Sequence, residues 1–457
     1  MNAVLIAVVL MLLLTMVLRV HVVLALFFSA LAGGLLAGLG LDATMVAFQD
    51  GLSGGAKIAL SYALLGAFAM AVSSAGLPEL LSQRILRLIG KPDDDTELTT
   101  DTLRRSTAVI KWLMLAGILA MSIMSQNLIP VHIAFIPLLI PPLLGVMNRL
   151  RLDRRLVACV LTFGLVTTYM WIPIGFGSIF LNDILLGNIE NAGLDTSEIQ
   201  IFRVMAIPAL GMISGLLIAV FISYRKPRDY QEVPLVQGQD AQVGPSRYKV
   251  AVSLIAIVAT FAVQLVMQVR DMEADALLVG ALVGLAIFLG TGVVNWRQAD
   301  DVFTQGMKMM AVIGFIMITA QGFASVMQAT GDLDGLVTGA ANIVGSNKGV
   351  AAMAMLLVGL LVTMGIGSSF STLPIITTIY VPLCLTLGFS PAATVAIIGA
   401  AGALGDAGSP ASDSTLGSTA GLNVDGQHDH IRDTVIPTFI HYNLPLLISG
   451  WIAAMVL

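Results

Sequence analysis

Residues 251–266 read AVSLIAIVATFAVQLV, an apolar stretch without a single charged side chain. A helix that crosses the hydrocarbon core of a bilayer needs about 20 predominantly apolar residues, whereas a strand of a membrane β-barrel shows about ten residues of alternating polarity. Unbroken runs of this kind recur along the chain. They predict transmembrane helices and not barrel strands.

The composition of the whole chain agrees with this interpretation. Of its 457 residues, 57% are hydrophobic and only 11% are charged, against about 25% charged residues in soluble domains. So few charges cannot cover a soluble protein of this length, which excludes a soluble enzyme, a nucleic-acid-binding protein and a disordered scaffold. We therefore expect an all-α polytopic protein of the bacterial inner membrane, with the lipid bilayer as a partner. Its spans are predicted at roughly residues 3–18, 21–40, 56–76, 156–178, 201–224, 249–268, 274–292, 308–328, 391–415 and 434–457.

Two further apolar stretches, 108–147 and 350–389, are interrupted midway by polar residues ahead of a proline. The first interruption is Ser125-Gln126-Asn127 before Pro130, and the second is Ser368-Ser369-Phe370-Ser371-Thr372 before Pro374. Each stretch is predicted to be a re-entrant hairpin of two half-helices. Two complete spans in place of each hairpin are the alternative, and they would leave the orientation of the chain unchanged.

Basic residues in short loops mark the cytoplasmic side of a membrane protein. Arginines and lysines flank both ends of the first hairpin, so both of those ends are expected to be cytoplasmic. Placing the other spans by alternation leaves only Lys57, Arg203, Arg270 and Lys348, of 23 basic residues, on the outer side. Both termini are then outside, and the polar stretch 226–248 is a cytoplasmic linker.

The order of these elements repeats between residues 1–225 and 249–457. Each half reads as five spans plus one re-entrant hairpin, and the two halves start on opposite sides of the membrane. Such inverted repeats provide two related conformations open to opposite sides, as alternating access requires. Three groups of residues match in the same order: Phe68, Ala69 and Gly76 with Phe323, Ala324 and Gly331, then Ser125 and Pro130 with Ser369 and Pro374, then Pro173 with Pro410.

Two of the predicted spans contain proline and glycine at midmembrane depth. The span 156–178 contains Pro173 and Gly175, and the span 391–415 contains the stretch from Gly405 to Thr415. An unwound backbone inside a membrane must be shielded by protein or line a water-filled cavity. Freed carbonyl oxygens, together with hydroxyl, amide and carboxylate side chains, suit Na⁺, and half-helix N-termini suit an anionic group. The two broken spans and the two hairpin tips are therefore the predicted site.

Asp406 and Asp413 are the acids of the second broken span. Intramembrane acids are costly and are candidates for function by default. Burial raises the pKa of a carboxyl group and a bound cation lowers it, so one such acid can hold Na⁺ or H⁺ in turn. The structural alternative is that one of the two, with Asp413 the more suited, caps the N-terminus of a half-helix.

The pattern Gly405-Asp406-x-x-Ser409-Pro410-x-Ser412-Asp413-x-Thr415 resembles the signature of the NhaC-type sodium/proton antiporter family, part of the ion transporter superfamily. Residues 421–430 and 437–443 resemble a branch whose members are named sodium/proton antiporters or, provisionally, amino acid permeases. The resemblance implies a homodimer and a cation and substrate site at the hairpin tips and broken spans. Carried over by position, it nominates Ser125, Gln126, Asn127, Pro173, Gly175, Ser369, Ser371, Thr372, Ser409, Ser412 and Thr415, with Asp406 and Asp413.

Three further residues are candidates for proton or substrate contacts, each with a structural alternative. Asp183 follows the first break but also lies near a predicted outer helix end. His132 is either a substrate or pH-sensing contact or a packed core histidine. His441 either carries a proton or forms an interhelical hydrogen bond. His428 and His430 have no further ligands at known spacings, so no metal site is expected.

The leading hypothesis is a secondary active transporter that works by alternating access, with Na⁺/H⁺ antiporter-like cation coupling. The alternative is a Na⁺- or H⁺-coupled permease for a basic amino acid such as histidine or arginine. No cofactor is expected besides the coupling ion. An intramembrane enzyme is not expected, because the chain has no His-Glu-x-x-His metalloprotease motif. A passive channel would not need inverted repeats.

Overall fold

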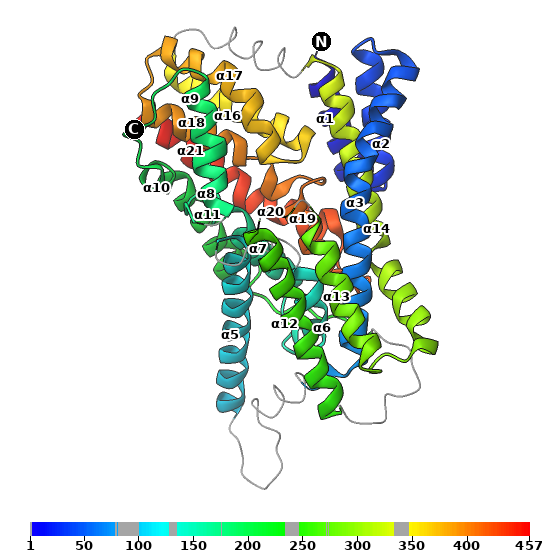
Figure 1. The fold of residues 1–457 in the computed structure, drawn as a ribbon. Coiled ribbons are helices and arrows are strands. Elements are labelled where there is room, and N and C mark those ends of the chain that lie inside the picture. The colour runs from blue at the N-terminus through cyan, green and yellow to red at the C-terminus, as the bar shows by residue number, and fades with distance from the viewer. Residues whose placement is uncertain are drawn as a thin grey trace.

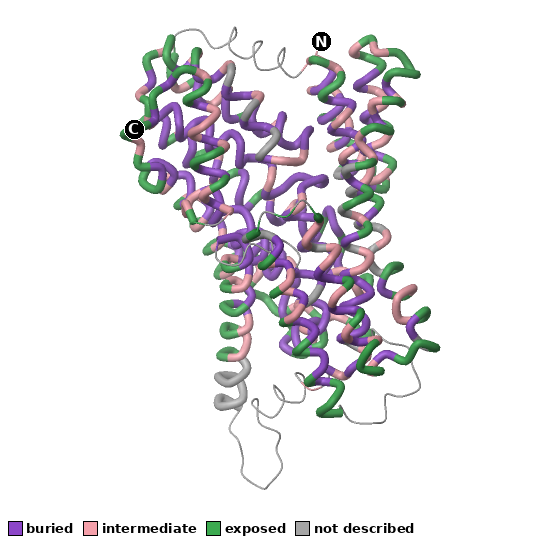
Figure 2. Tube along the Cα trace, viewed as in Figure 1, coloured by how far each residue is buried: buried purple, intermediate pink, exposed green. Residues whose placement is uncertain are grey.

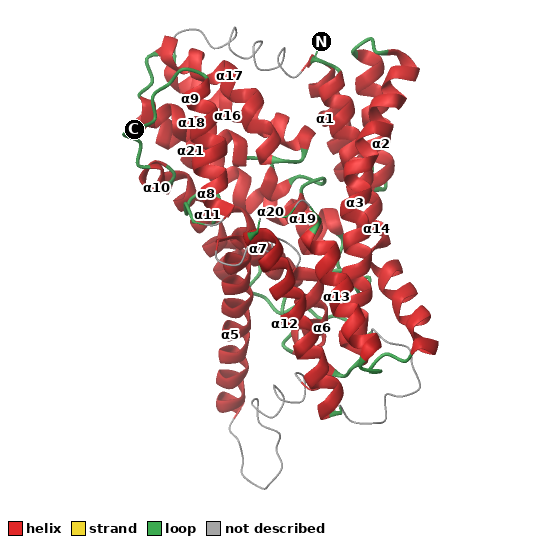
Figure 3. Cartoon of the chain, in the orientation of Figure 1, coloured by secondary structure: helices red, strands yellow, loops and turns green. Residues whose placement is uncertain are grey.

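A computed structural model describes residues 2–77, 80, 100–127, 135–174, 176–233, 246–270, 272, 274–332 and 347–457. Within these ranges the regular structure is helical throughout (Figure 3). This agrees with the predicted fold class. The first half contains α1 (Ala3–Leu12), α2 (Val22–Leu36), α3 (Gly40–Ser74), α5 (Thr100–Asn127), α6 (Phe135–Arg149), α7 (Arg154–Val166), α8 (Phe176–Ser178), α9 (Gly187–Asn191), α10 (Ile201–Val204) and α11 (Ala206–Ile218).

The second half follows the linker. It contains α12 (Arg247–Val269), α13 (Ala276–Gly290), α14 (Trp296–Ala329), α16 (Lys348–Ile366), α17 (Ser369–Leu387), α18 (Pro391–Ala403), α19 (Asp413–Leu422), α20 (Ile436–Thr438) and α21 (Leu444–Val456). Short π-helical stretches extend α1, join α8 to α9, extend α11, and connect the segments from His430 to α21.

Seven helical segments in the described ranges are long and apolar enough to cross a membrane. Shorter apolar helices add to them near the N-terminus and within the second half of the chain. The expected spans 56–76 and 308–328 are parts of longer helices, α3 and α14, which begin at Gly40 and Trp296. Both broken spans also continue further than predicted, to Asn191 and to Leu422, because a second helical piece follows each break.

The long helices α3 and α14 lie side by side along one side of the molecule (Figure 1). The lower part of α3 also packs with α12 and α13 in a separate hydrophobic cluster, where the rings of Phe68 and Phe288 meet edge to face at 5.6 Å. The larger cluster joins α1 and α2 to the hairpins, the broken spans and α21. The broken spans are thus at the centre of the larger core.

Buried residues concentrate around the broken spans, and exposed residues lie on the outer helices (Figure 2). Many of the exposed side chains are large and apolar, including Leu113 of α5, Val258 of α12, Phe315 of α14 and Ile448 of α21. An apolar outer surface around a packed centre is suited to lipid and not to water.

The two hairpins begin at opposite ends of the molecule. In Figure 1, α5 starts at the lower end and α16 at the upper end, and both run toward the middle. The tip of the first hairpin, residues 128–134, lies outside the described residues. The second tip is the turn at Gly367 and Ser368, where Gly367 has φ +77°. The inverted repeat itself stays a prediction.

A buried ion pair connects the start of α7 to the loop after α19. Arg154 Nη2 lies 2.5 Å from Asp425 Oδ2, and the two side chains are 0% and 3% exposed. Arg154 Nη1 also donates to the carbonyl oxygen of Leu422 at 2.9 Å, at the C-terminus of α19. A cation at this end of a helix stabilises its last carbonyls. The first piece of one broken span is therefore joined to the second piece of the other.

The second break begins where Leu404 is extended and Gly405 adopts φ +92°. A side chain at this φ is strained. A Cβ on Gly405 would also lie 3.1 Å from the Leu360 carbonyl oxygen and from the Met364 amide nitrogen. Glycine at 405 therefore serves both the left-handed turn and the close approach of α16.

We expect Gly405→Ala to lower the free energy of unfolding by about 1–2 kcal/mol, because it combines a left-handed alanine with crowding of α16. Gly117→Ala is the matched control, since a Cβ on Gly117 of α5 meets nothing within 4 Å. It should be neutral or stabilise by up to about 1 kcal/mol. Denaturant titration of both variants in detergent measures the difference, and equal stabilities would contradict this account of the break.

Candidate functional site

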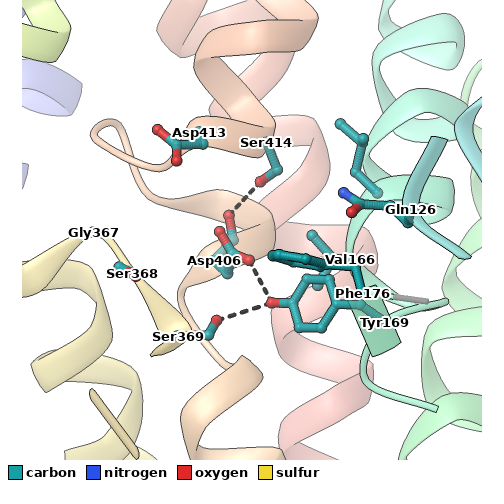
Figure 4. Close-up of a pocket in the computed structure, with 11 residues that line it drawn as sticks. Gln126, Val166, Tyr169, Phe176, Gly367, Ser368, Ser369, Asp406, Asp413 and Ser414 are labelled. Carbon is teal, nitrogen blue, oxygen red and sulfur yellow. Dashed lines mark hydrogen bonds between the residues drawn. The ribbon is translucent and has the colours of Figure 1, made fainter. Parts of the chain in front are cut away.

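A cavity of about 160 Å³ lies where the two breaks and the second hairpin tip meet (Figure 4). Its walls come from the end of α5, the first break, the turn before α17 and the second break. It is therefore built from both halves of the chain. The lining residues are Gln126, Leu165, Val166, Tyr169, Phe176, Gly367, Ser368, Ser369, Asp406, Asp413 and Ser414.

Asp406 is the acid at the centre of the polar contacts in this cavity. The Tyr169 hydroxyl donates to Asp406 Oδ2 at 2.5 Å and hydrogen-bonds Ser369 Oγ at 2.9 Å. The Tyr169 ring is held edge-on by Phe176 and Phe180, at centroid distances of 5.9 and 4.7 Å. One phenol thus connects the first break, the second hairpin and the second break.

Hydroxyl side chains bind the carbonyl oxygens that the second break releases. Ser412 and Ser414 donate to the Asp406 carbonyl oxygen at 2.6 and 2.7 Å, and Thr415 donates to the Ser409 carbonyl oxygen at 2.6 Å. The sequence predicted that the break frees carbonyl oxygens to bind a cation, but the carbonyl oxygens of Asp406 and Ser409 accept hydrogen bonds from hydroxyl groups. In this conformation these oxygens already have protein donors.

The Pro410 carbonyl oxygen has a different partner, His430 Nε2, at 2.9 Å. His430 Nδ1 hydrogen-bonds Thr419 Oγ1 at 2.8 Å, and Thr419 Oγ1 lies 2.9 Å from Thr434 Oγ1. Thr434 Oγ1 in turn lies 2.7 Å from His428 Nε2. A buried polar chain, from Pro410 to His428, therefore leads away from the break.

The first break is supported in the same way, by an amide. Asn127 Nδ2 lies 3.1 Å from the carbonyl oxygens of both Ile172 and Ile174. Ser125 donates instead to the Ser122 carbonyl oxygen of its own helix at 2.8 Å. Pro173 is half-buried and lies outside the cavity lining.

Asp413 is the first residue of α19, and Ser412 occupies the N-cap position without a side-chain capping bond. A carboxylate in the first turn interacts favourably with the positive end of the helix. Asp413 is half-buried and lines the cavity, and Figure 4 shows it apart from the contact between Tyr169 and Asp406. The two acids thus share one cavity in different surroundings.

Four of the predicted residues are brought together at the cavity: Gln126, Ser369, Asp406 and Asp413. Several others are placed elsewhere. Thr372 donates to the Ser368 carbonyl oxygen at 2.9 Å. The remaining predicted residues that are described but do not line the cavity are Ser125, Asn127, Pro173, Asp183, Ser409, Ser412, Thr415 and His441.

The three proton or substrate candidates are also located away from the cavity or outside the described residues. Asp183 is exposed. His441 has both ring nitrogens occupied, by Ser223 Oγ at 2.8 Å and by the Pro437 carbonyl oxygen at 2.7 Å. His132, Gly175 and the side chain of Ser371 lie outside the described residues.

Sequence reasoning missed Tyr169, Ser414 and Phe176 as lining residues. Tyr169 lies shortly before the first break, so the sequence places it near the predicted site. Nothing in the sequence indicates that its hydroxyl contacts Asp406, which is 237 positions away. Ser414 directly follows Asp413 within residues 405–415, so its position next to a predicted acid was the signal that could have identified it. In the described part of the chain, no group of three or more histidine, cysteine and acidic side chains is placed to hold a metal ion.

Comparison with known proteins identifies the family of the chain. The sequence profile described as "Na+/H+ antiporter family" matches residues 160–451, more than half of the chain, and a second profile described as "Na+-H+ antiporter family" matches residues 2–89. The chain belongs to the Na⁺/H⁺ antiporter family. It is accordingly a membrane transporter and not an enzyme.

Similar proteins come from several bacteria. The chain is 54% identical over 459 residues to an uncharacterised membrane protein of Vibrio parahaemolyticus, with all of both chains covered. It is 51% identical over 464 residues to an uncharacterised membrane protein of Haemophilus influenzae, covering 100% of this chain and 99% of that one. It is also 51% identical over 458 residues, all of both chains, to a Bacillus subtilis protein provisionally named amino acid transporter YuiF.

Two solved structures align with most of the chain at low similarity. The YdaH transporter of Alcanivorax borkumensis is 15% identical, with a TM-score of 0.39 and coverage of 92% of this chain and 89% of that one. The efflux pump MtrF of Neisseria gonorrhoeae is 17% identical, with a TM-score of 0.37 and coverage of 91% and 84%. These scores are too low to establish a shared fold.

The contact between Tyr169 and Asp406 yields a stability prediction. Tyr169→Phe removes the donor to a carboxyl group, and we expect it to lower the free energy of unfolding by about 2–3 kcal/mol. Tyr380→Phe is the matched control, because the buried Tyr380 hydroxyl donates to a neutral acceptor, the Met355 carbonyl oxygen, at 2.7 Å. Its loss should be about 1 kcal/mol. Equal losses in denaturant titrations would show that Asp406 accepts as a neutral acid.

His428 gives a pH prediction. Burial lowers the pKa of His428 to about 3, against about 6.5 in an unfolded chain. Between these values the unfolded chain binds a proton that the folded chain does not, so stability is lost as the pH falls below 6.5. His428→Gln keeps a nitrogen donor near Thr434 but cannot titrate. Between pH 7.5 and 5.5 its melting temperature should fall less than that of the wild type. Parallel slopes would contradict the assignment.

Proposed function

We propose that this transporter is coupled to Na⁺ or H⁺, with the Asp406 carboxylate as the group that holds the coupling ion. The observation that carries the proposal is the set of contacts around Asp406, which Tyr169 of the first half binds at 2.5 Å while also contacting Ser369 of the second hairpin at 2.9 Å. A carboxylate in a membrane interior is costly unless a cation or proton neutralises it. The same group can therefore exchange one for the other, as an antiporter requires.

Asp413 supports this role as a second acid in the same small cavity. Two carboxylates that share a site repel each other when both are ionised, so the pair favours uptake of a cation or a proton. Asp413 also stands at the N-terminus of α19, where the helix partly compensates its charge. Asp406 lacks that compensation, which makes it the better exchange site of the two.

The size of the cavity suits a small cation. Its volume of about 160 Å³ is below the roughly 300–1,000 Å³ typical of pockets for larger organic ligands. A hydrated Na⁺ fits such a space. Movement of the hairpins or of one half of the chain against the other would expose the site to alternate sides of the bacterial inner membrane.

A Na⁺- or H⁺-coupled amino acid permease is the second candidate. Its support is the relative provisionally named amino acid transporter YuiF, which is 51% identical over the full length of both chains. In that case the cavity would have to widen to admit the solute, and the coupling ion would still occupy Asp406. The two candidates therefore share one ion site and differ in what moves with the ion.

Reconstitution in liposomes with a trapped pH dye tests the ion site. An imposed Na⁺ gradient should drive proton movement through the wild type, and Asp406→Asn should reduce it to the level of empty liposomes, because an amide cannot exchange a cation for a proton. Asp300→Asn is the matched control, an exposed acid near the start of α14 outside the cavity. It should transport as the wild type does.

Labelled histidine and arginine in the same liposomes separate the two candidates. Na⁺-driven accumulation of either amino acid without proton movement would favour the permease. If neither a Na⁺ gradient nor a pH gradient moves the counter-ion or either amino acid, or if folded Asp406→Asn transports normally, the proposed role of Asp406 is wrong. Thermal unfolding of the purified variants establishes that each is folded before its transport is compared.

A further inference from the structure

A second, larger cavity lies at the other end of the polar chain from the break. Its volume is about 860 Å³. It opens between the connection from α1 to α2, residues 15–22, and the segment 423–436 that follows α19, with Ile316 of α14 contributing to its wall. Arg19 and Arg432 both belong to the predicted cytoplasmic side. The cavity is separate from the one that contains Asp406, because the two share no lining residue.

Two of the lining residues are arginines without a carboxylate partner. Among the described residues, neither Arg19 nor Arg432 forms an ion pair, and both are exposed. Of the two acids of the cavity, only Asp433 forms an ion pair among the described residues. Asp433 pairs with Arg228 at 2.8 Å, and Asp429 Oδ1 accepts the backbone amide of Arg432 at 2.7 Å. Two guanidinium groups are therefore available to a ligand.

Arg19 is held at the cavity by an unusual backbone conformation. Its φ is +58°, in the left-handed region that residues other than glycine rarely adopt. The turn is maintained on both sides, since the Leu18 amide donates to the Leu13 carbonyl at 3.0 Å and the Val20 amide to the Leu14 carbonyl at 2.8 Å. Strained positions of this kind cluster at functional sites. Glycine would adopt this conformation more easily than arginine, so the turn alone does not explain the arginine at position 19.

A buried polar atom in the cavity wall also lacks a partner. His428 is 1% exposed, and its Nε2 contacts Thr434 while its Nδ1 has no hydrogen-bond partner among the described residues. Buried polar groups in native proteins are nearly always satisfied by protein, water or a ligand. His428 Nδ1 is therefore a third polar position that a ligand or its bound water can occupy.

We propose that this cavity binds an anionic group, a carboxylate or a phosphate, through the guanidinium groups of Arg19 and Arg432. Arginine presents a planar fork of donors that matches both anions. The anion belongs either to a small cytoplasmic solute or to a lipid headgroup that enters from the bilayer. Both sources present negatively charged oxygen atoms to the two arginines, and binding in detergent and in nanodiscs distinguishes them.

The position of the site relative to the break gives it a consequence for transport. His428 lies in the cavity wall and connects through Thr434, Thr419 and His430 to the Pro410 carbonyl oxygen. A ligand that orders the segment 423–436 therefore acts on the same hydrogen bonds that hold the unwound segment of the second broken span.

Binding to the full-length protein in detergent tests the site. Inorganic phosphate and succinate are titrated at constant Na⁺ concentration and ionic strength, because exposed charges respond to salt in general, and thermal unfolding reports binding. The double variant Arg19→Gln/Arg432→Gln should require at least about tenfold more phosphate or succinate for half-saturation. Arg19→Lys/Arg432→Lys keeps both positive charges but lacks the planar guanidinium donors. It should reach half-saturation at an anion concentration between those of the wild type and the double Gln variant. Arg297→Gln, an exposed arginine outside the cavity, should bind as the wild type does.

A second arm uses nanodiscs of phosphatidylglycerol or phosphatidylcholine. Stabilisation of the wild type by phosphatidylglycerol that the double Gln variant loses, without a response to phosphate or succinate, assigns the anion to a lipid headgroup. A response to the soluble anions assigns it to a cytoplasmic solute. If the double Gln variant and Arg297→Gln respond alike, or if the wild type responds to neither arm, the proposal is wrong.

Discussion

The structure depends on one constraint, that every polar group of a backbone unwound inside a membrane protein must find a partner without water. In the break between α18 and α19 the partners are hydroxyl groups for the Asp406 and Ser409 carbonyls and an imidazole for the Pro410 carbonyl. The Asn443 side chain accepts the Gly405 amide at 3.1 Å. The serines and threonines of this segment are therefore first of all the replacement for lost helical hydrogen bonds.

This use of hydroxyl groups decides which residues remain for a ligand. Ser412 and Thr415 hold the backbone, so the cavity receives the carboxyl groups of Asp406 and Asp413 and the Tyr169 phenol. Tyr169 contacts both Asp406 and Ser369. A change in the position of the second hairpin would therefore alter the hydrogen bond between Tyr169 and Asp406. If Asp406 holds the coupling ion as proposed, this contact would link ion binding to the position of the second hairpin, because binding can drive a conformational change only through contacts that differ between the two states.

The same break also faces a second region of the protein through His430. One side of the unwound segment contributes the acids of the smaller cavity, and the other side leads through Thr419 and Thr434 to His428 and the larger one. The buried pair of Arg154 and Asp425 fixes the loop between these regions to the start of α7. Segments from both halves of the sequence thus meet around a few unwound residues, and two chemically different cavities lie beside this unwound part of the backbone.

The sequence alone determined the class of protein, the positions of most spans and the two breaks, because apolar length and proline or glycine within a span act locally on the chain. It also pointed to Asp406 and Asp413, since an acid is conspicuous in an apolar span. Only the tertiary structure decided which polar side chains face a cavity and which bind the backbone. Ser409 and Ser369 are equally good oxygen ligands in the sequence, yet only Ser369 lines the cavity. The partner of Asp406 is a tyrosine from the other half of the chain, and contacts over such a separation arise only from packing.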